Sequence, residues 1–79
     1  MKGNMDMVKE IMIKDKEQVE KINKLATHAP YEVWVSNSTM MLDARSLLGL
    51  FSLIGKKAQV VAEDSVDPKA FARLVNKMA

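Results

Sequence analysis

The chain has no cysteine and only one histidine among its 79 residues. Without cysteine it can form neither a disulfide nor a thiolate nucleophile, so its stability must come from packing. Zinc and iron sites usually need several nitrogen or sulfur ligands, and these are missing. We therefore expect no metal site and no cofactor, and the lack of cysteine suits a cytoplasmic protein.

Long apolar runs and clusters of one charge are missing as well. No stretch approaches the roughly 20 apolar residues of a membrane helix, and the first residues do not resemble a signal peptide. Twelve basic and ten acidic residues give a net charge of +2, and the lysines are interleaved with carboxylates. Only Lys56 and Lys57 are adjacent cations. We expect neither membrane insertion nor binding to nucleic acid, because phosphate backbones are bound by clustered cations.

The composition, 48% hydrophobic and 28% charged, is that of an ordinary globular protein, and the length allows one domain over residues 1–79. Hydrophobic periodicity, caps and turn residues predict strands over residues 7–13, 31–35, 39–42 and 58–62 and helices over about 16–27, 47–54 and 68–78. The order β-α-β-β-α-β-α favours a two-layer α+β domain with helices on one face of a sheet. Trp34 and Met41 are expected on the open face or at its edge.

The three helices have different sequence signals. Asp15 is the predicted N-cap of the first helix, whose buried stripe is expected to be Val19, Ile22, Leu25 and Ala26. Asp67 and Pro68 begin the last helix, with Phe71, Leu74, Val75 and Met78 buried. In the middle helix, Ser46 is the predicted N-cap, Leu50, Leu53 and Ile54 are expected to turn inward, and Gly55 ends the helix.

The segment from Ser46 to Leu53 reads Ser-Leu-Leu-Gly-Leu-Phe-Ser-Leu. It resembles a motif of the histidine-containing phosphocarrier protein (HPr) of the bacterial sugar phosphotransferase system. The resemblance extends over residues 31–63 and, in the order of elements, over nearly the whole chain. It implies an HPr-like open-faced β-sandwich, with a four-stranded antiparallel sheet and three helices on one face.

The resemblance gives Ser46 a second interpretation. As an N-cap, its hydroxyl is expected to accept a hydrogen bond from the amide of Leu48 or Gly49. In the resembling family, the serine at this position is phosphorylated by a regulatory kinase. A plain cap and a regulated cap both fit the sequence.

Leu47, Leu48 and Phe51 are expected on the outer face of the middle helix, beside Ser46. Such an exposed apolar patch is typical of an interaction surface. The resemblance implies protein partners, namely phosphotransferase enzymes, a serine kinase or a transcriptional regulator. The alternatives are a weak homodimer contact, in a chain otherwise expected to be a monomer, or packing under the chain's own N-terminus.

The residues expected for phosphoryl transfer are replaced. Phosphocarriers of the family have a His-Ala-Arg-Pro motif at the start of the first helix. Without gaps, this chain has Asp15 at the histidine position, Glu17 at the arginine position and Gln18 at the proline position. Since acceptor and cation are both lost, we expect no catalytic residue. Asp15 as an acyl-phosphate acceptor is a minor alternative, because aspartyl phosphates usually form beside a metal and a lysine.

His28 is the remaining histidine, followed by Ala29 and Pro30. It falls at the end of the first helix, where a histidine side chain can bond the terminal carbonyls.

Three hypotheses remain open for the function of the chain. The first is a non-catalytic HPr-like regulatory or adaptor protein that binds through Leu47, Leu48 and Phe51 and is controlled at Ser46. The second is an active phosphocarrier that uses His28 or Asp15. The third is an interaction domain that shares only the fold.

Overall fold

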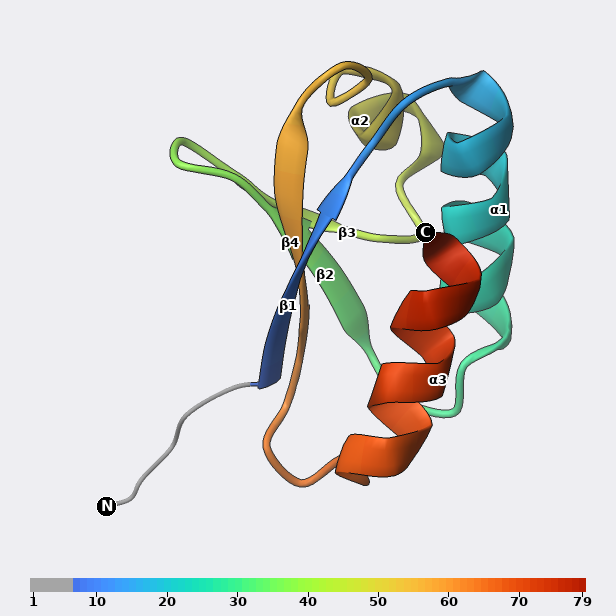
Figure 1. The fold of residues 1–79 in the computed structure, drawn as a ribbon, viewed down its shortest axis with the longest axis vertical. Coiled ribbons are helices and arrows are strands. Elements are labelled where there is room, and N and C mark those ends of the chain that lie inside the picture. Colours follow the sequence, from blue (N-terminus) through green and yellow to red (C-terminus); the bar gives the residue numbers. More distant parts are fainter. Residues whose placement is uncertain (1–6) are drawn as a thin grey trace.

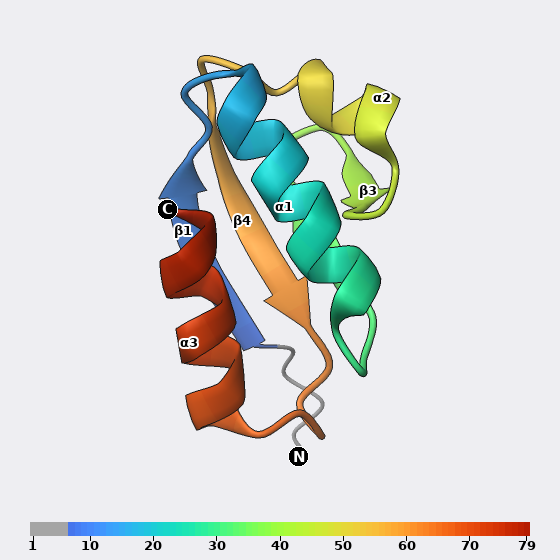
Figure 2. The same cartoon turned by 90° about the vertical axis from the view of Figure 1, so that its right-hand side faces the viewer.

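Four strands form one antiparallel sheet in the order β1-β4-β2-β3 in the computed structural model, which describes residues 7–79. The elements in chain order are β1 (Met7–Met12), α1 (Lys16–His28), β2 (Val33–Ser36), β3 (Met41–Asp43), α2 (Leu47–Phe51), β4 (Lys57–Ala62) and α3 (Pro68–Met78). The predicted α+β class and element order are therefore confirmed. The three helices cover one face of the sheet, with α1 packed against both α2 and α3 (Figures 1 and 2).

β4 is a central strand, paired with β1 on one side and with β2 on the other. Val60 lies opposite Lys9 of β1 and Val35 of β2, and it faces the helices. Its neighbour Val61 points to the open face, where Val8 and Trp34 flank it and leave it buried. Side chains alternate between the two faces of a strand, so one strand serves both surfaces of the sheet.

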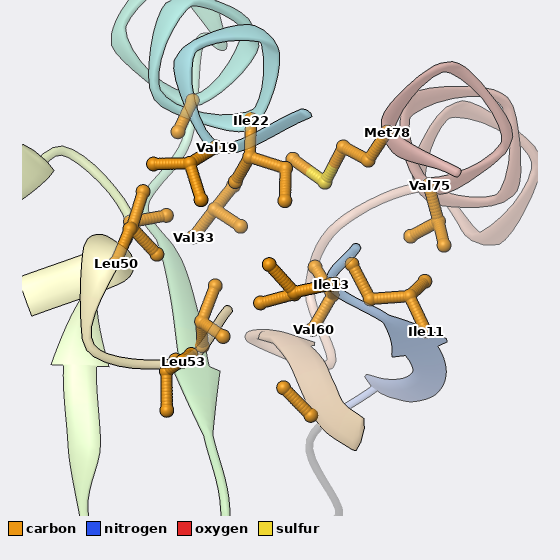
Figure 3. Packing of buried hydrophobic residues seen from close by; sticks show 14 of the residues in the cluster. Ile11, Ile13, Val19, Ile22, Val33, Leu50, Leu53, Val60, Val75 and Met78 are labelled. Carbon is orange, nitrogen blue, oxygen red and sulfur yellow. The ribbon is translucent and has the colours of Figure 1, made fainter. Parts of the chain in front are cut away.

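The hydrophobic core lies between the sheet and the helices (Figure 3). Fully buried side chains come from every layer, and each contributes about 1.5–3 kcal/mol through removal of apolar surface from water. The largest are Phe71, Ile13, Ile22, Leu50, Leu53 and Met78. The predicted buried stripes of α1 and α3 are confirmed, although Leu25 and Leu74 are only partly buried.

The hairpin between β2 and β3 is shifted by one or two residues from its predicted place. The strands were expected over residues 31–35 and 39–42, and they lie at Val33–Ser36 and Met41–Asp43. Asn37 explains the shift, because its side-chain oxygen accepts from the amides of Thr39 (2.9 Å) and Met40 (3.0 Å). Such local bonds draw residues 37–40 into the turn.

The predicted open face is confirmed for Trp34 and Met41, which share that side of the sheet, Trp34 partly buried and Met41 exposed on the edge strand β3.

The middle helix is shorter than predicted, since α2 ends at Phe51 rather than at residue 54. Ile54 was expected to turn inward, but this is wrong, as its side chain is 36% exposed. The chain leaves the helical spacing after Phe51, so the i+4 position from Leu50 no longer faces the core. Gly55 then turns with φ +87°, a conformation that favours glycine, and its amide donates to the Ile13 carbonyl at 2.7 Å.

Candidate functional site

The start of α1 is the place where a phosphocarrier of the resembling family would have its histidine. Asp15 has extended backbone angles there, and its carboxylate accepts from the amide of Gln18 at 2.8 Å. The predicted N-cap is thus confirmed. Glu17 follows as an exposed carboxylate in the first turn. The positive end of the helix dipole stabilises both negative charges. The carboxylate of Asp15 is already engaged as the cap of the helix.

Gln18, noted in the sequence only for standing at the proline position of the family motif, has a structural role that the sequence did not indicate. Its side chain is 93% removed from solvent, with a relative exposure of 7%. The amide nitrogen donates to the carbonyls of Met12 (2.8 Å) and Met78 (3.0 Å), and the amide oxygen accepts from the backbone of Lys14 (2.7 Å). One side chain therefore joins the end of β1, the start of α1 and the end of α3.

A shallow hollow of about 300 Å³ lies beside this junction. Two lysines and two carboxylates line it together with Gln18 and Ala79, the charged residues being Lys14, Asp15, Glu17 and Lys21. The opposite charges balance, so the hollow has no net attraction for an anion. A phosphoryl group placed here would meet two carboxylates as well as two lysines, and it would find no histidine to accept it.

Ser46 stands at the N-cap position of α2, but the predicted cap bond is wrong. Its side chain makes no cap hydrogen bond, while its backbone amide donates to the Asp43 carbonyl (2.8 Å) and its carbonyl accepts from Leu50 (3.0 Å). A Cβ on Gly49 would lie 3.3 Å from the Ser46 hydroxyl oxygen and 3.1 Å from a methyl carbon of Leu42. Glycine at 49 thus leaves room for the Ser46 hydroxyl and for close packing of Leu42 against α2.

The loop before Ser46 is held on two sides. The Arg45 guanidinium donates to both carboxylate oxygens of Asp43, from Nε at 3.0 Å and from Nη2 at 2.7 Å, and a second carboxylate, Glu32, lies 3.6 Å away. The Arg45 side chain lowers the pKa of Asp43 to about 2. On the other side, the Asn23 amide of α1 donates to the Arg45 carbonyl at 2.9 Å. These contacts fix the backbone of the residue that directly precedes Ser46.

The apolar surface beside Ser46 is centred on Leu48, which is 85% exposed. Leu47 is 37% exposed, and Phe51 is partly buried and packs against the core. We call these three residues the α2 patch. The expectation that all three lie on the outer face is right for the leucines and wrong for Phe51, because the phenyl ring is shared between the surface and the core. Leu50 and Leu53 face inward as predicted.

His28 lies in the last turn of α1, where its Nδ1 is 2.9 Å from the Lys24 carbonyl oxygen. The predicted place at the end of the helix is confirmed, but the carbonyl that the ring contacts lies one turn back from the helix end rather than among the last four. The 13 residues of α1 span about 20 Å, so His28 is far from Asp15. The structure does not bring the histidine into the hollow at the start of the helix.

Within residues 7–79 no three side chains of the metal-binding types gather into a cluster. Over the same residues, no helix has the length and apolar character needed to cross a membrane.

Neither a family model nor a curated protein matches the sequence. Solved structures do match in three dimensions. HPr-C-His from Thermoanaerobacter tengcongensis has a TM-score of 0.69 and 21% identity, covering 94% of this chain and 90% of that one. The phosphocarrier protein HPr from Bacillus anthracis has a TM-score of 0.70 and 17% identity, covering 94% and 98%. The chain therefore has the open-faced α+β fold of the HPr phosphocarrier proteins.

Proposed function

We propose that this chain is an HPr-like adaptor protein that binds protein partners through the α2 patch and is controlled by phosphorylation of Ser46. The observation that carries the proposal is the exposed Leu48 side chain near Ser46, an exposed serine whose hydroxyl makes no cap bond. The fold shared with HPr proteins supports it. The partners are expected among phosphotransferase enzymes, a serine kinase or a transcriptional regulator, in a cytoplasmic setting.

Phosphoryl transfer by the chain itself is not part of the proposal. Asp15 serves as an N-cap, Glu17 brings a second carboxylate, and the arginine position of the family motif holds no cation. A like charge beside an incoming phosphoryl group raises the barrier to transfer. We therefore propose a protein that is not an enzyme and needs no cofactor.

Phosphorylation of Ser46 would act on binding rather than on folding. The phosphate adds a charge of about −1.5 to −2 at neutral pH, directly beside the two exposed leucines. The neighbouring cation, Arg45, is already held by Asp43 and Glu32. The new charge would thus remain exposed to a partner, favouring one with basic groups around an apolar pocket and disfavouring an acidic one.

A binding experiment with purified candidate partners tests the proposal. We expect Leu48→Ser to weaken binding at least about tenfold, because an exposed anchor of an interface is removed. Val8→Ser is the matched control, since Val8 is 54% exposed but lies on the open face of the sheet. Ser46→Asp should change the affinity, whereas Ser46→Ala should not. If Ser46→Asp alters binding to no partner, the chain is an interaction domain that shares only the fold.

Incubation with phosphoenolpyruvate and the general phosphotransferase enzyme tests the alternative of an active phosphocarrier. Mass spectrometry of the chain is expected to show no adduct. An acid-labile adduct at His28, or a hydroxylamine-sensitive adduct at Asp15, would replace the adaptor proposal with a carrier.

A further inference from the structure

A second hollow, of about 260 Å³, is lined by the end of α1, the loop that follows it and one side of α3. The two helices contact each other, and in Figure 2 the loop after α1 lies below α1 and beside the lower turns of α3. The walls include apolar side chains of both helices, among them Leu25 and Leu74. Its polar groups are His28, Tyr31, Arg73 and Lys77. The hollow shares no lining residue with the α2 patch or with the hollow at Asp15.

All the charged residues that line this hollow are basic. Arg73 and Lys77 are one turn apart on α3, and both are exposed. Like charges at this spacing repel by a few tenths of a kcal/mol, roughly 0.2–0.5. Within residues 7–79 neither makes an ion pair, because the ion pairs of that part of the chain belong to Arg45. A bound anion would relieve the repulsion and give both cations a partner.

Tyr31 adds a neutral donor on the wall formed by the loop. The ring is partly buried and packs against the core. Burial raises the pKa of its hydroxyl, against the opposing effect of Arg73, while Asp67 raises it further. The phenol therefore stays protonated at neutral pH and keeps its hydrogen. Asp67 acts on Tyr31 from outside the lining of the hollow.

The preference of cations for helix C-termini accounts for part of this arrangement. His28 and Lys77 are the basic residues in the last turns of α1 and α3. Arg73 lies in the body of α3, so its position has no such cause. The preference of cations for helix ends also does not explain why the cations of α3 line the same hollow as Tyr31 and the apolar residues at the end of α1.

We propose that this hollow binds a small organic anion, a carboxylate or phosphate carried on a short apolar or aromatic body. Arg73 and Lys77 hold the charged group, and the apolar walls between α1 and α3 hold the body. The volume is slightly below the roughly 300–1,000 Å³ of pockets for drug-sized molecules, which favours a ligand of about one ring. The site is independent of the function proposed for the α2 patch.

Titrations of the isotope-labelled chain, followed by amide NMR shifts, test the site with phenyl phosphate and benzoate as probes. We expect saturable shifts confined to the end of α1, residues 29–31 and residues 70–77, with millimolar affinity. Phenol lacks the charged group and inorganic phosphate lacks the ring. Each should bind at least about tenfold more weakly than phenyl phosphate, since a factor of ten in affinity corresponds to the loss of about one good contact.

Variants then show which groups carry the binding. Arg73→Gln and Lys77→Gln should each weaken phenyl phosphate about tenfold or more, as expected for loss of a charge-assisted hydrogen bond. Lys69→Gln is the matched control, being an exposed lysine of α3 outside the hollow. Unchanged thermal melting confirms that each variant is folded. The proposal is overturned if no probe saturates, if inorganic phosphate binds as well as phenyl phosphate, or if Lys69→Gln weakens binding as much as Arg73→Gln.

Discussion

Asp15 and Ser46 occupy the same position at the starts of two helices, yet only Asp15 makes a cap bond. Loss of a working N-cap costs about 1 kcal/mol, so Asp15→Ala should lower the free energy of unfolding by that amount. Ser46→Ala should change it by less than about 0.5 kcal/mol, as surface substitutions usually do. Urea unfolding of the two variants measures both values. Equal losses would show that the Ser46 hydroxyl caps α2 in solution.

Gln18 allows a sharper test of a single side chain. Gln18→Leu keeps most of its volume but removes the donors to Met12 and Met78 and the acceptor for Lys14. Buried groups left without a partner cost about 1–3 kcal/mol, and we expect a loss of about 2 kcal/mol in urea unfolding. Glu17→Gln, next to it and exposed, is the control and should stay close to wild type. A stable Gln18→Leu variant would mean that water replaces the three bonds at no cost.

The ion pair between Asp43 and Arg45 makes the stability of the fold depend on pH in the acidic range. The pKa of Asp43 is lowered from its ordinary value of 3.8 to about 2, chiefly by the side-chain hydrogen bonds from Arg45. A carboxyl whose pKa is lower in the folded than in the unfolded chain stabilises the fold at any pH above its unfolded-state pKa. This stabilisation is lost as the pH falls toward its folded-state pKa. Both side chains are largely open to solvent, so water and salt screen the pair and its contribution to the free energy of unfolding is small.

Asp43→Asn should therefore be less stable than wild type at neutral pH, and the difference should shrink between pH 4 and pH 2. Urea unfolding across this range measures it, and NMR titration of the Asp43 carboxyl gives the pKa directly. A difference that persists unchanged at pH 2 would assign the effect to packing of the side chain rather than to its charge.

At the scale of elements, α2 divides its leucines between the core and the surface. Leu50 is fully buried, so Leu50→Ala should cost about 2–5 kcal/mol. Leu48→Ala should stay within about 0.5 kcal/mol, because its side chain is exposed. Phe51→Ser should fall between them, since its ring packs partly on the core. Thermal and urea unfolding rank the three. A large loss for Leu48 would mean that its exposed position is wrong.

The same helix shows why sequence patterns predicted some elements better than others. α1 and α3 run for three turns or more with one apolar stripe, and a repeated signal of this kind fixes both the element and its buried face. α2 has only five residues and ends at Phe51, so the helical spacing from which Ile54 was predicted to face inward does not extend to that residue. Short strands are likewise bounded by turn contacts such as those of Asn37, which a residue pattern does not contain.

For the whole molecule, the candidate sites differ in how far the sequence indicated them. Asp15, Ser46 and the leucines of the α2 patch follow from local caps and a motif, so they could be named in advance. Gln18 and the basic hollow depend on contacts between segments far apart in the chain, such as the 60 residues that separate Gln18 from Met78. Tertiary packing brings these groups together, and the spacing of residues along the sequence does not indicate which of them will be in contact.

The topology predicts how the molecule opens. β4 is bonded to a strand on each side, whereas β3 has three residues and one partner strand. The Val60 amide should therefore exchange only through global unfolding, at a free energy of about 4–12 kcal/mol for a chain of this size. The Leu42 amide, at the sheet edge, should exchange through local opening at least about 1 kcal/mol lower. Native-state hydrogen exchange by NMR measures both. Equal protection of the two amides would show that β3 unfolds only together with the core. The α2 segment that packs on β3 would then be held in place, and the α2 patch would bind its partners as a rigid surface.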